Sequence, residues 1–164
     1  MGQVKTPIIF GLVRIAMGWI FLWAFLDKLF GFGLATESGK AWINGVSPTT
    51  GFLKFGTADK TFADFFQGLA GSPVVDWLYM IGMLGVGLAL IFGVMVRFSS
   101  WVGAIIMILI LAASLPLTHN PLVDEHVVYI LILIALPAMN AGRSLGLGNS
   151  WKETDVVQRN KFWE

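Results

Sequence analysis

The sequence has 164 residues, of which 56 % are hydrophobic and 13 % are charged, with a formal net charge of +1 at pH 7. This composition excludes a water-soluble domain of that size and predicts an integral membrane protein. The absence of cysteine excludes disulfides, iron–sulfur clusters and covalently attached haem, so any redox role needs a diffusible cofactor or a partner. The nearly neutral charge gives no reason to expect nucleic acid.

Four apolar stretches predict an all-α, integral membrane four-helix bundle that forms a single domain over residues 1–164. The first three stretches each have about the ~17 to 25 residues that a helix needs to cross ~30 Å of lipid. The fourth is apolar only from Val127, so a span there has to begin near Leu122. Pro137 should kink or end that helix. The predicted spans and the tail that follows them are 7–30, 74–96, 99–117, 122–141 and 142–164.

The first span carries polar and aromatic residues at helical spacing. Trp19, Trp23 and Asp27 are four residues apart, so they share one face that emerges at the outer surface. We interpret this face as a pocket wall. Lys28 should pair with an acid or extend outward to the headgroups. Arg14 lies about 20 Å along the helix from Asp27, which leaves it either a functional intramembrane charge or a side chain that reaches headgroups.

About 40 residues, Gly31 to Ser72, separate the first two spans and predict a long helical extracytoplasmic loop. Ser47 followed by Pro48 is typical of a helix start. Farther on, apolar residues at i, i+3, i+4 and i+7 predict an amphipathic helix, which would lie on the bilayer or cover the bundle. These residues are Phe62, Phe65, Phe66 and Leu69.

Small residues in the second span predict how it packs. Gly85, Ala89 and Gly93 recur every four residues, a pattern that allows another helix to approach closely. We therefore expect this face to contact the bundle and Leu90 to face outward.

A polar cluster lies at the start of the fourth span. Glu125, His126 and Tyr129 fall on one side of a helix, whereas Asp124 points away from His126 on an ideal helix. His119 adds a second imidazole on the preceding loop. Because the topology places these residues near Asp27, we predict a site at the outer ends of helices one and four.

Three interpretations of this cluster remain open. A metal is the least favoured interpretation, because His119 and His126 lack the i, i+4 spacing that places two imidazoles on one helical face, and we name no metal ligand. A quinone site needs a flat apolar slot, a hydrogen-bond donor and a proton acceptor, which tryptophans, histidine, carboxylates and tyrosine could supply. The third interpretation is a structural hydrogen-bond network that holds the helix ends together.

Basic residues predict the orientation, because cytoplasmic loops carry an excess of lysine and arginine. With both termini cytoplasmic, the basic residues inside are Lys5, Arg97, Arg143, Lys152, Arg159 and Lys161. Those outside are Lys28, Lys40, Lys54 and Lys60, all at the first loop. We therefore expect a multi-pass protein of the cell membrane.

An ordered set of motifs resembles the DoxX/DoxD family of small four-helix membrane proteins over nearly the whole chain. The motifs are Arg14-x3-Gly18-x8-Asp27-Lys28, Ile81-Gly82, Gly87-Leu88-Ala89-Leu90-x2-Gly93, His119-Asn120-Pro121-Leu122-x-Asp124-Glu125-His126-x2-Tyr129 and Gly142-Arg143-x-Leu145-Gly146-Leu147-Gly148. Through the DoxD branch the resemblance implies the small subunit of thiosulfate:quinone oxidoreductase, which oxidises thiosulfate to tetrathionate and passes the electrons to quinone. In one departure, Met83 follows Gly82 where many relatives carry a glutamate.

Two hypotheses follow. In the first, the chain is the membrane subunit of a quinone-linked oxidoreductase: Asp27, His126 and Tyr129 handle protons and Trp19 and Trp23 flank the quinone ring. The remaining candidate binding residues are Lys28, His119, Asp124 and Glu125. In the second, the chain is a non-catalytic membrane scaffold or small-molecule-binding protein that recruits a soluble partner. Candidate partners are the lipid bilayer, a soluble or membrane oxidoreductase subunit, and a second copy of the chain.

Overall fold

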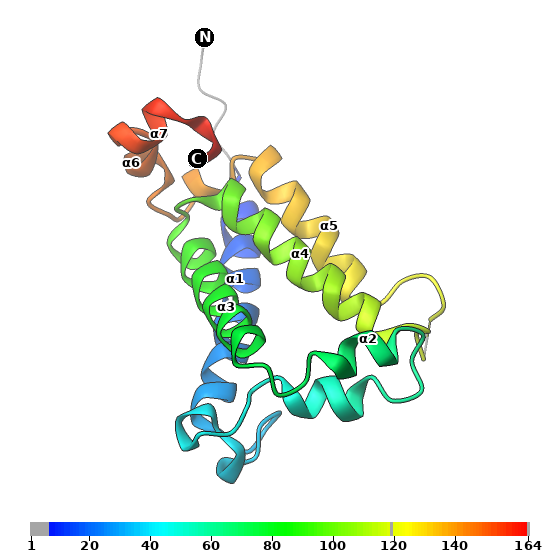
Figure 1. Cartoon of the computed structure of the whole chain (residues 1–164). Helices are drawn as coiled ribbons and strands as arrows, with labels where there is room; N and C mark the ends of the chain where they lie inside the picture. Colours follow the sequence, from blue (N-terminus) through cyan, green and yellow to red (C-terminus); the bar gives the residue numbers. More distant parts are fainter. Residues whose placement is uncertain (1–6, 119, 164) are drawn as a thin grey trace.

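The computed structural model describes residues 7–118 and 120–163, and the chain is helical without a strand in those residues (Figure 1). This confirms the all-α prediction. The α-helices are α1 (Ile8–Phe30), α2 (Ala63–Gly68), α3 (Pro73–Phe92), α4 (Val96–Ser114), α5 (Glu125–Ala138), α6 (Gly148–Lys152) and α7 (Asp155–Arg159). Shorter 3-10 or π-helical turns are η1 (Ser38–Lys40), η2 (Trp42–Asn44), η3 (Phe52–Gly56), η4 (Ala141–Arg143) and η5 (Lys161–Trp163).

Three of the described helices, α1, α3 and α4, are long and apolar enough to cross a membrane. The fourth apolar helix, α5, has 14 residues and thus reaches only about 21 Å at 1.5 Å per residue. It is shorter than the predicted range 122–141 because Asp124 caps its first turn, and it ends one residue after Pro137. A fourth span through α5 therefore stays a prediction.

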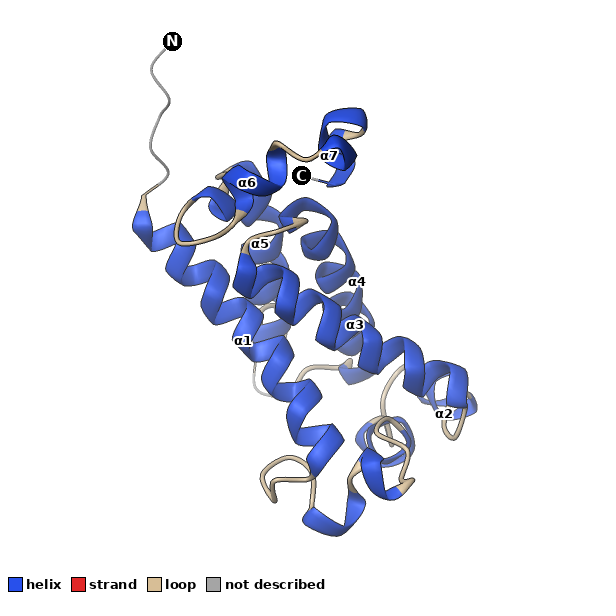
Figure 2. Cartoon of the chain, turned by 90° about the vertical axis from the view of Figure 1, so that its left-hand side faces the viewer, coloured by secondary structure: helices blue, strands red, loops and turns tan. Residues whose placement is uncertain are grey.

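Helices α1, α3, α4 and α5 are arranged as two pairs. α1 packs chiefly against α3, and α4 chiefly against α5, while α3 and α4 join the pairs. The pairs lie close together at the end that carries α6 and α7, which we call the terminal end (Figures 1 and 2). They diverge toward the opposite end, where α2 and the rest of the long loop lie across them; we call this the loop end.

Glycines set the close approach of α1 to α3. A Cβ atom on Gly18 would lie 2.9 Å from the Gly87 carbonyl oxygen, and one on Gly87 would lie 2.8 Å from the Leu22 backbone nitrogen. Gly85, by contrast, faces open space, and Leu90 is fully buried. The predicted packing face was therefore wrong at Gly85 and Leu90, whereas Gly93, at the end of α3, is buried in close contact with Arg14 and Gly142. Because a membrane helix is apolar all round, its small residues alone do not identify the buried side.

Apolar side chains from all four helices fill the core between the pairs. Phe21 of α1, Val86 of α3, Met107 of α4 and Leu133 of α5 belong to one buried cluster. Met83 is in the same cluster and is 3 % exposed. Met83, which the sequence analysis noted as a departure from the family resemblance, is thus a packed thioether in the core.

The long loop is tied to the first turn of α3 by a buried carboxylate. Asp76 accepts hydrogen bonds from the hydroxyls of Ser47, at 2.8 Å, and Thr49, at 2.5 Å. The Ser47 hydroxyl oxygen also accepts the Thr50 backbone N–H at 3.1 Å, as expected at a helix start. These contacts fix the loop over the loop end of the helices.

The amphipathic helix predicted in the loop is present as the six-residue α2. Phe66 is buried in a small cluster with Leu53 and Ala113, and Leu69 packs against that cluster. Phe62 and Phe65, however, remain exposed. The apolar stripe is therefore divided, with half of it packed on the protein and half facing outward.

Arg14 joins three segments at the terminal end. Its side chain is fully buried, so it does not reach the headgroups as one interpretation allowed. The guanidinium donates hydrogen bonds to backbone carbonyls at the end of α3 and in the segment after α5. The acceptors are Leu90, Ile91, Ala141, Ser144 and Leu145. Arg14 thereby satisfies carbonyls that a helix end leaves without a partner.

Candidate functional site

The strongest candidate site is a cavity of about 380 Å³ at the loop end. Its walls come from the end of α4, the segment that follows it, the start of α5 and Lys60 of the long loop. Polar side chains of Ser114, Thr118 and Asn120 lie around it together with the acidic and imidazole groups of α5. The cavity thus combines hydrogen-bonding and titratable groups next to membrane helices.

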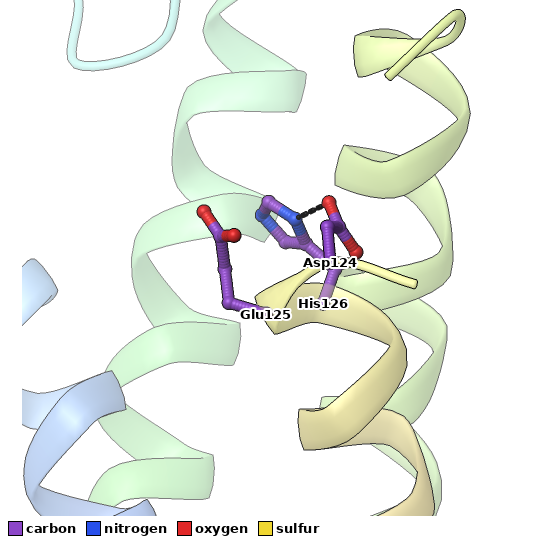
Figure 3. A group of neighbouring side chains, drawn as sticks. All are labelled: Asp124, Glu125 and His126. Atoms are coloured by element: carbon purple, nitrogen blue, oxygen red, sulfur yellow. Dashed lines mark hydrogen bonds and ion pairs between the residues drawn. The ribbon is translucent and has the colours of Figure 1, made fainter. Parts of the chain in front are cut away.

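A histidine–carboxylate pair lies at the centre of this site (Figure 3). Nδ1 of His126 is 2.8 Å from Oδ2 of Asp124, and the two side chains are 19 % and 15 % exposed. Because an ionised carboxylate only accepts hydrogen bonds, Nδ1 is the donor. The other ring nitrogen, Nε2, lies on the side of Glu125 and is available to a ligand.

Asp124 also begins α5. Its Oδ1 accepts the Val127 backbone N–H at 3.1 Å, so this carboxylate caps the helix while it orients the imidazole. Burial alone raises the pKa of Asp124. The hydrogen bonds from His126 and from the Val127 N–H outweigh that effect, and the net pKa lies below its usual value of 3.8. The prediction that Asp124 points away from His126 was wrong, because Asp124 is extended and precedes the first helical residue, Glu125.

Asp124, Glu125 and His126 each offer one ligand atom, and these atoms lie within 4.8 Å of one another. Such groups can ligate a cation. Nδ1 is however already bonded to Asp124, which leaves only Nε2 and the exposed Glu125 for an ion. Two ligands fall short of the usual protein set, and we assign no metal here.

Asp27 does not join this pair. Its side chain is 2 % exposed, and neither carboxylate oxygen has a hydrogen-bond partner among the described residues. It therefore makes no hydrogen bond to His126 or Tyr129. Tyr129 is half-buried against the apolar core, and Lys28 forms no ion pair within the described chain. The divergence of the helix pairs toward the loop end separates α1 from α5 and explains this difference from the prediction.

Trp19 and Trp23 are neighbours, as their spacing predicts, but they face outward. Their ring centroids are 5.9 Å apart, and the residues are 51 % and 36 % exposed. Trp23 also stacks on Phe32 at 5.6 Å. Neither tryptophan is among the residues that line the cavity at His126. This aromatic face is suited to contact lipid at the membrane interface.

Some site features were not predicted, and one predicted residue is outside the described part. His119 lies between the described ranges 7–118 and 120–163. Lys60 was not expected at the site; its ammonium donates to the Pro116 carbonyl at 3.2 Å, and its side chain lines the cavity. The sequence shows that Lys60 precedes the amphipathic helix of the loop. It does not show that the loop folds back and brings Lys60 to the cavity at the start of α5.

Comparison with known proteins gives one match. A sequence model described as DoxX matches residues 10–115, which is more than half of the chain. No curated protein and no solved structure matches the chain.

Proposed function

Because the chain belongs to the DoxX family and is a multi-pass membrane protein, we propose that it is the membrane subunit of a quinone-linked oxidoreductase. The proposed quinone site is the cavity beside His126. The observation that carries the proposal is the 2.8 Å contact between His126 and Asp124 at that cavity. An imidazole held by a carboxylate is a group suited to move protons near neutral pH.

The volume of the cavity and its hydrogen-bonding groups support a quinone ring as the ligand, with Leu117 and Val123 as the apolar part of its lining. Its volume of about 380 Å³ is within the range of roughly 300–1,000 Å³ found for small-molecule sites. A quinone bound there accepts two electrons and two protons when it is reduced. Amide and ammonium groups around the cavity, from Asn120 and Lys60, can donate hydrogen bonds to carbonyl oxygens.

The roles of the two side chains follow from their geometry. With Nδ1–H donated to Asp124, Nε2 is the atom of His126 that takes up or gives a proton. The Asp124 carboxylate stabilises the positive charge that protonation places on the ring. Glu125 is exposed and lies on the Nε2 side, where it can exchange protons with the aqueous phase.

The chain needs an electron donor from outside, since it has no cysteine for an iron–sulfur cluster. The DoxD-like resemblance implies thiosulfate as that donor. A soluble or membrane partner subunit is the proposed site of thiosulfate oxidation. Two thiosulfate ions would release two electrons when they join through a new S–S bond as tetrathionate, which balances the reduction of one quinone.

A scaffold remains the second candidate, and a specific contact favours it. Asp124 caps α5 as well as orienting His126, so this carboxylate also stabilises the start of the helix. In that case the polar cluster closes the helix end, and the exposed loop recruits a soluble partner.

Quinone content separates the two candidates. We expect wild type, purified in mild detergent from membranes, to carry quinone that organic extraction and chromatography detect. His126→Gln should lose it, whereas Trp19→Phe, which alters an outward-facing side chain away from the cavity, should keep it. Equal quinone content in wild type and His126→Gln would favour the scaffold.

A further inference from the structure

A second cavity lies at the opposite, terminal end, in the groove between the start of α4 and the end of α5. Its volume is about 220 Å³. The residues that matter for its chemistry are Arg97, Ser100 and Trp101 on α4, and Leu133, Ile134 and Pro137 on α5. None of the quinone-site residues belongs to it.

The groove contains a buried hydroxyl without a partner. Ser100 is 2 % exposed, and its Oγ atom makes no hydrogen bond within the described residues. The adjacent Ser99 is different, because its hydroxyl donates to the carbonyls of Met95, at 2.9 Å, and Val96, at 3.3 Å. A buried hydroxyl without a partner costs free energy, which a ligand acceptor in the groove would recover.

The guanidinium of Arg97 lies at the opening of the same groove. Arg97 is exposed and pairs with no carboxylate in residues 7–118 or 120–163. Its one hydrogen bond that the structure records is a long contact of 3.5 Å to the Lys161 carbonyl. Arg97 also lies in the first turn of α4, where backbone N–H groups and the helix dipole favour an anion.

The remaining walls suit a hydrocarbon chain at the membrane interface. Ile134 presents apolar surface, and Trp101 is 55 % exposed beside it. Tryptophan is enriched at the level of lipid headgroups. The groove therefore offers a cation, a hydroxyl donor and an apolar surface. These three groups would pair with the phosphate, an ester oxygen and an acyl chain of a phospholipid, respectively.

We propose that this groove binds an anionic phospholipid of the leaflet at the terminal end, with its phosphate on Arg97 and an ester oxygen on the Ser100 hydroxyl. This site is independent of the quinone proposal. If the predicted orientation holds, the leaflet is the cytoplasmic one.

The test is a lipid titration of the full-length protein in detergent, read by native mass spectrometry. Phosphatidylglycerol and phosphatidylcholine with identical acyl chains serve as probes. We expect phosphatidylglycerol to bind about fivefold more tightly, the effect of roughly one interfacial charge. Arg97→Gln should remove that preference, whereas Arg159→Gln on the exposed face of α7 should retain it.

The neighbouring serines give a second, matched pair. Ser100→Ala should weaken both lipids by about fivefold, the value of one ordinary hydrogen bond, without lowering the lipid-free melting temperature. Ser99→Ala should lower that temperature and leave lipid affinity unchanged. If Arg97→Gln fails to fold, the comparison of Ser100→Ala with Ser99→Ala still tests whether the groove binds lipid. Equal binding of the two lipids, equal losses in Arg97→Gln and Arg159→Gln, or unchanged binding in Ser100→Ala would overturn the proposal.

Discussion

The side chain of Arg14 donates from Nε to the carbonyl oxygen of Ala141, 3.1 Å away and 127 positions later in the chain. The same guanidinium serves four more carbonyls from the end of α3 and the segment after η4. A single α1 residue thus holds together the terminal ends of α1 and α3 and the turn after α5. Its function in this structure is to satisfy backbone groups.

Replacing Arg14 should therefore destabilise the fold. Arg14→Gln leaves buried carbonyls without donors and should lower the free energy of unfolding by about 3 kcal/mol or more. Thermal unfolding in detergent, calibrated by chemical denaturation, measures this loss. Arg159→Gln is the control, because Arg159 is exposed. Similar stabilities for the two variants would contradict the role given to Arg14.

Two glycines of α3 should respond oppositely to alanine. Gly87→Ala places a Cβ atom 2.8 Å from the Leu22 nitrogen and should cost about 1–3 kcal/mol through overpacking. Gly85→Ala enters open space and should be neutral or stabilise the helix by up to about 1 kcal/mol. Melting temperatures of the two variants check the prediction. A larger loss at Gly85 would mean that α3 packs through another face.

The orientation prediction can be checked with reporter fusions. Fusions at Arg97 and after Gly148 should report the cytoplasm, since the basic residues gather at those segments. Fusions near Lys54 and Asn120 should report the exterior. Agreement at all four sites also requires that α5 cross the membrane. An exterior signal after Gly148 would contradict the four-span topology.

Stability at acidic pH should depend on Asp124. Its pKa is lowered in the folded protein, so its ionised form contributes stability above the usual value of 3.8. That contribution is lost as the pH falls through the lowered folded value. We expect Asp124→Asn, which keeps a capping oxygen but has no charge to titrate, to show a smaller drop in melting temperature between about pH 5 and pH 3 than wild type. Identical pH profiles would show that the ionised Asp124 carboxylate does not stabilise the fold.

The sequence was sufficient to place the long helices. Long apolar runs with few charges mark α1, α3 and α4, and Gly93 in a left-handed conformation ends α3. Hydrophobicity does not distinguish a lipid-facing side from a buried one, however. That is why Leu90 was expected to face outward although it is buried.

The site was harder to predict because it depends on how helix ends are arranged. Helical spacing correctly made Trp19 and Trp23 neighbours, and the turn at Asp124 brought His126 to its carboxylate. The expected contact of Asp27 with His126 depended on the distance between α1 and α5, which the divergence of the helix pairs increases. Local spacing contains no information about that divergence.

The binding of a quinone analogue to wild type and to His126→Ala, at matched folded fraction, tests the proposed function most directly. A short-chain analogue is titrated into each protein in detergent, and the dissociation constants are compared. Loss of one charge-assisted hydrogen bond should weaken binding by at least about tenfold in His126→Ala. Indistinguishable binding curves would remove His126 from the site and contradict the quinone-linked function proposed for this cavity.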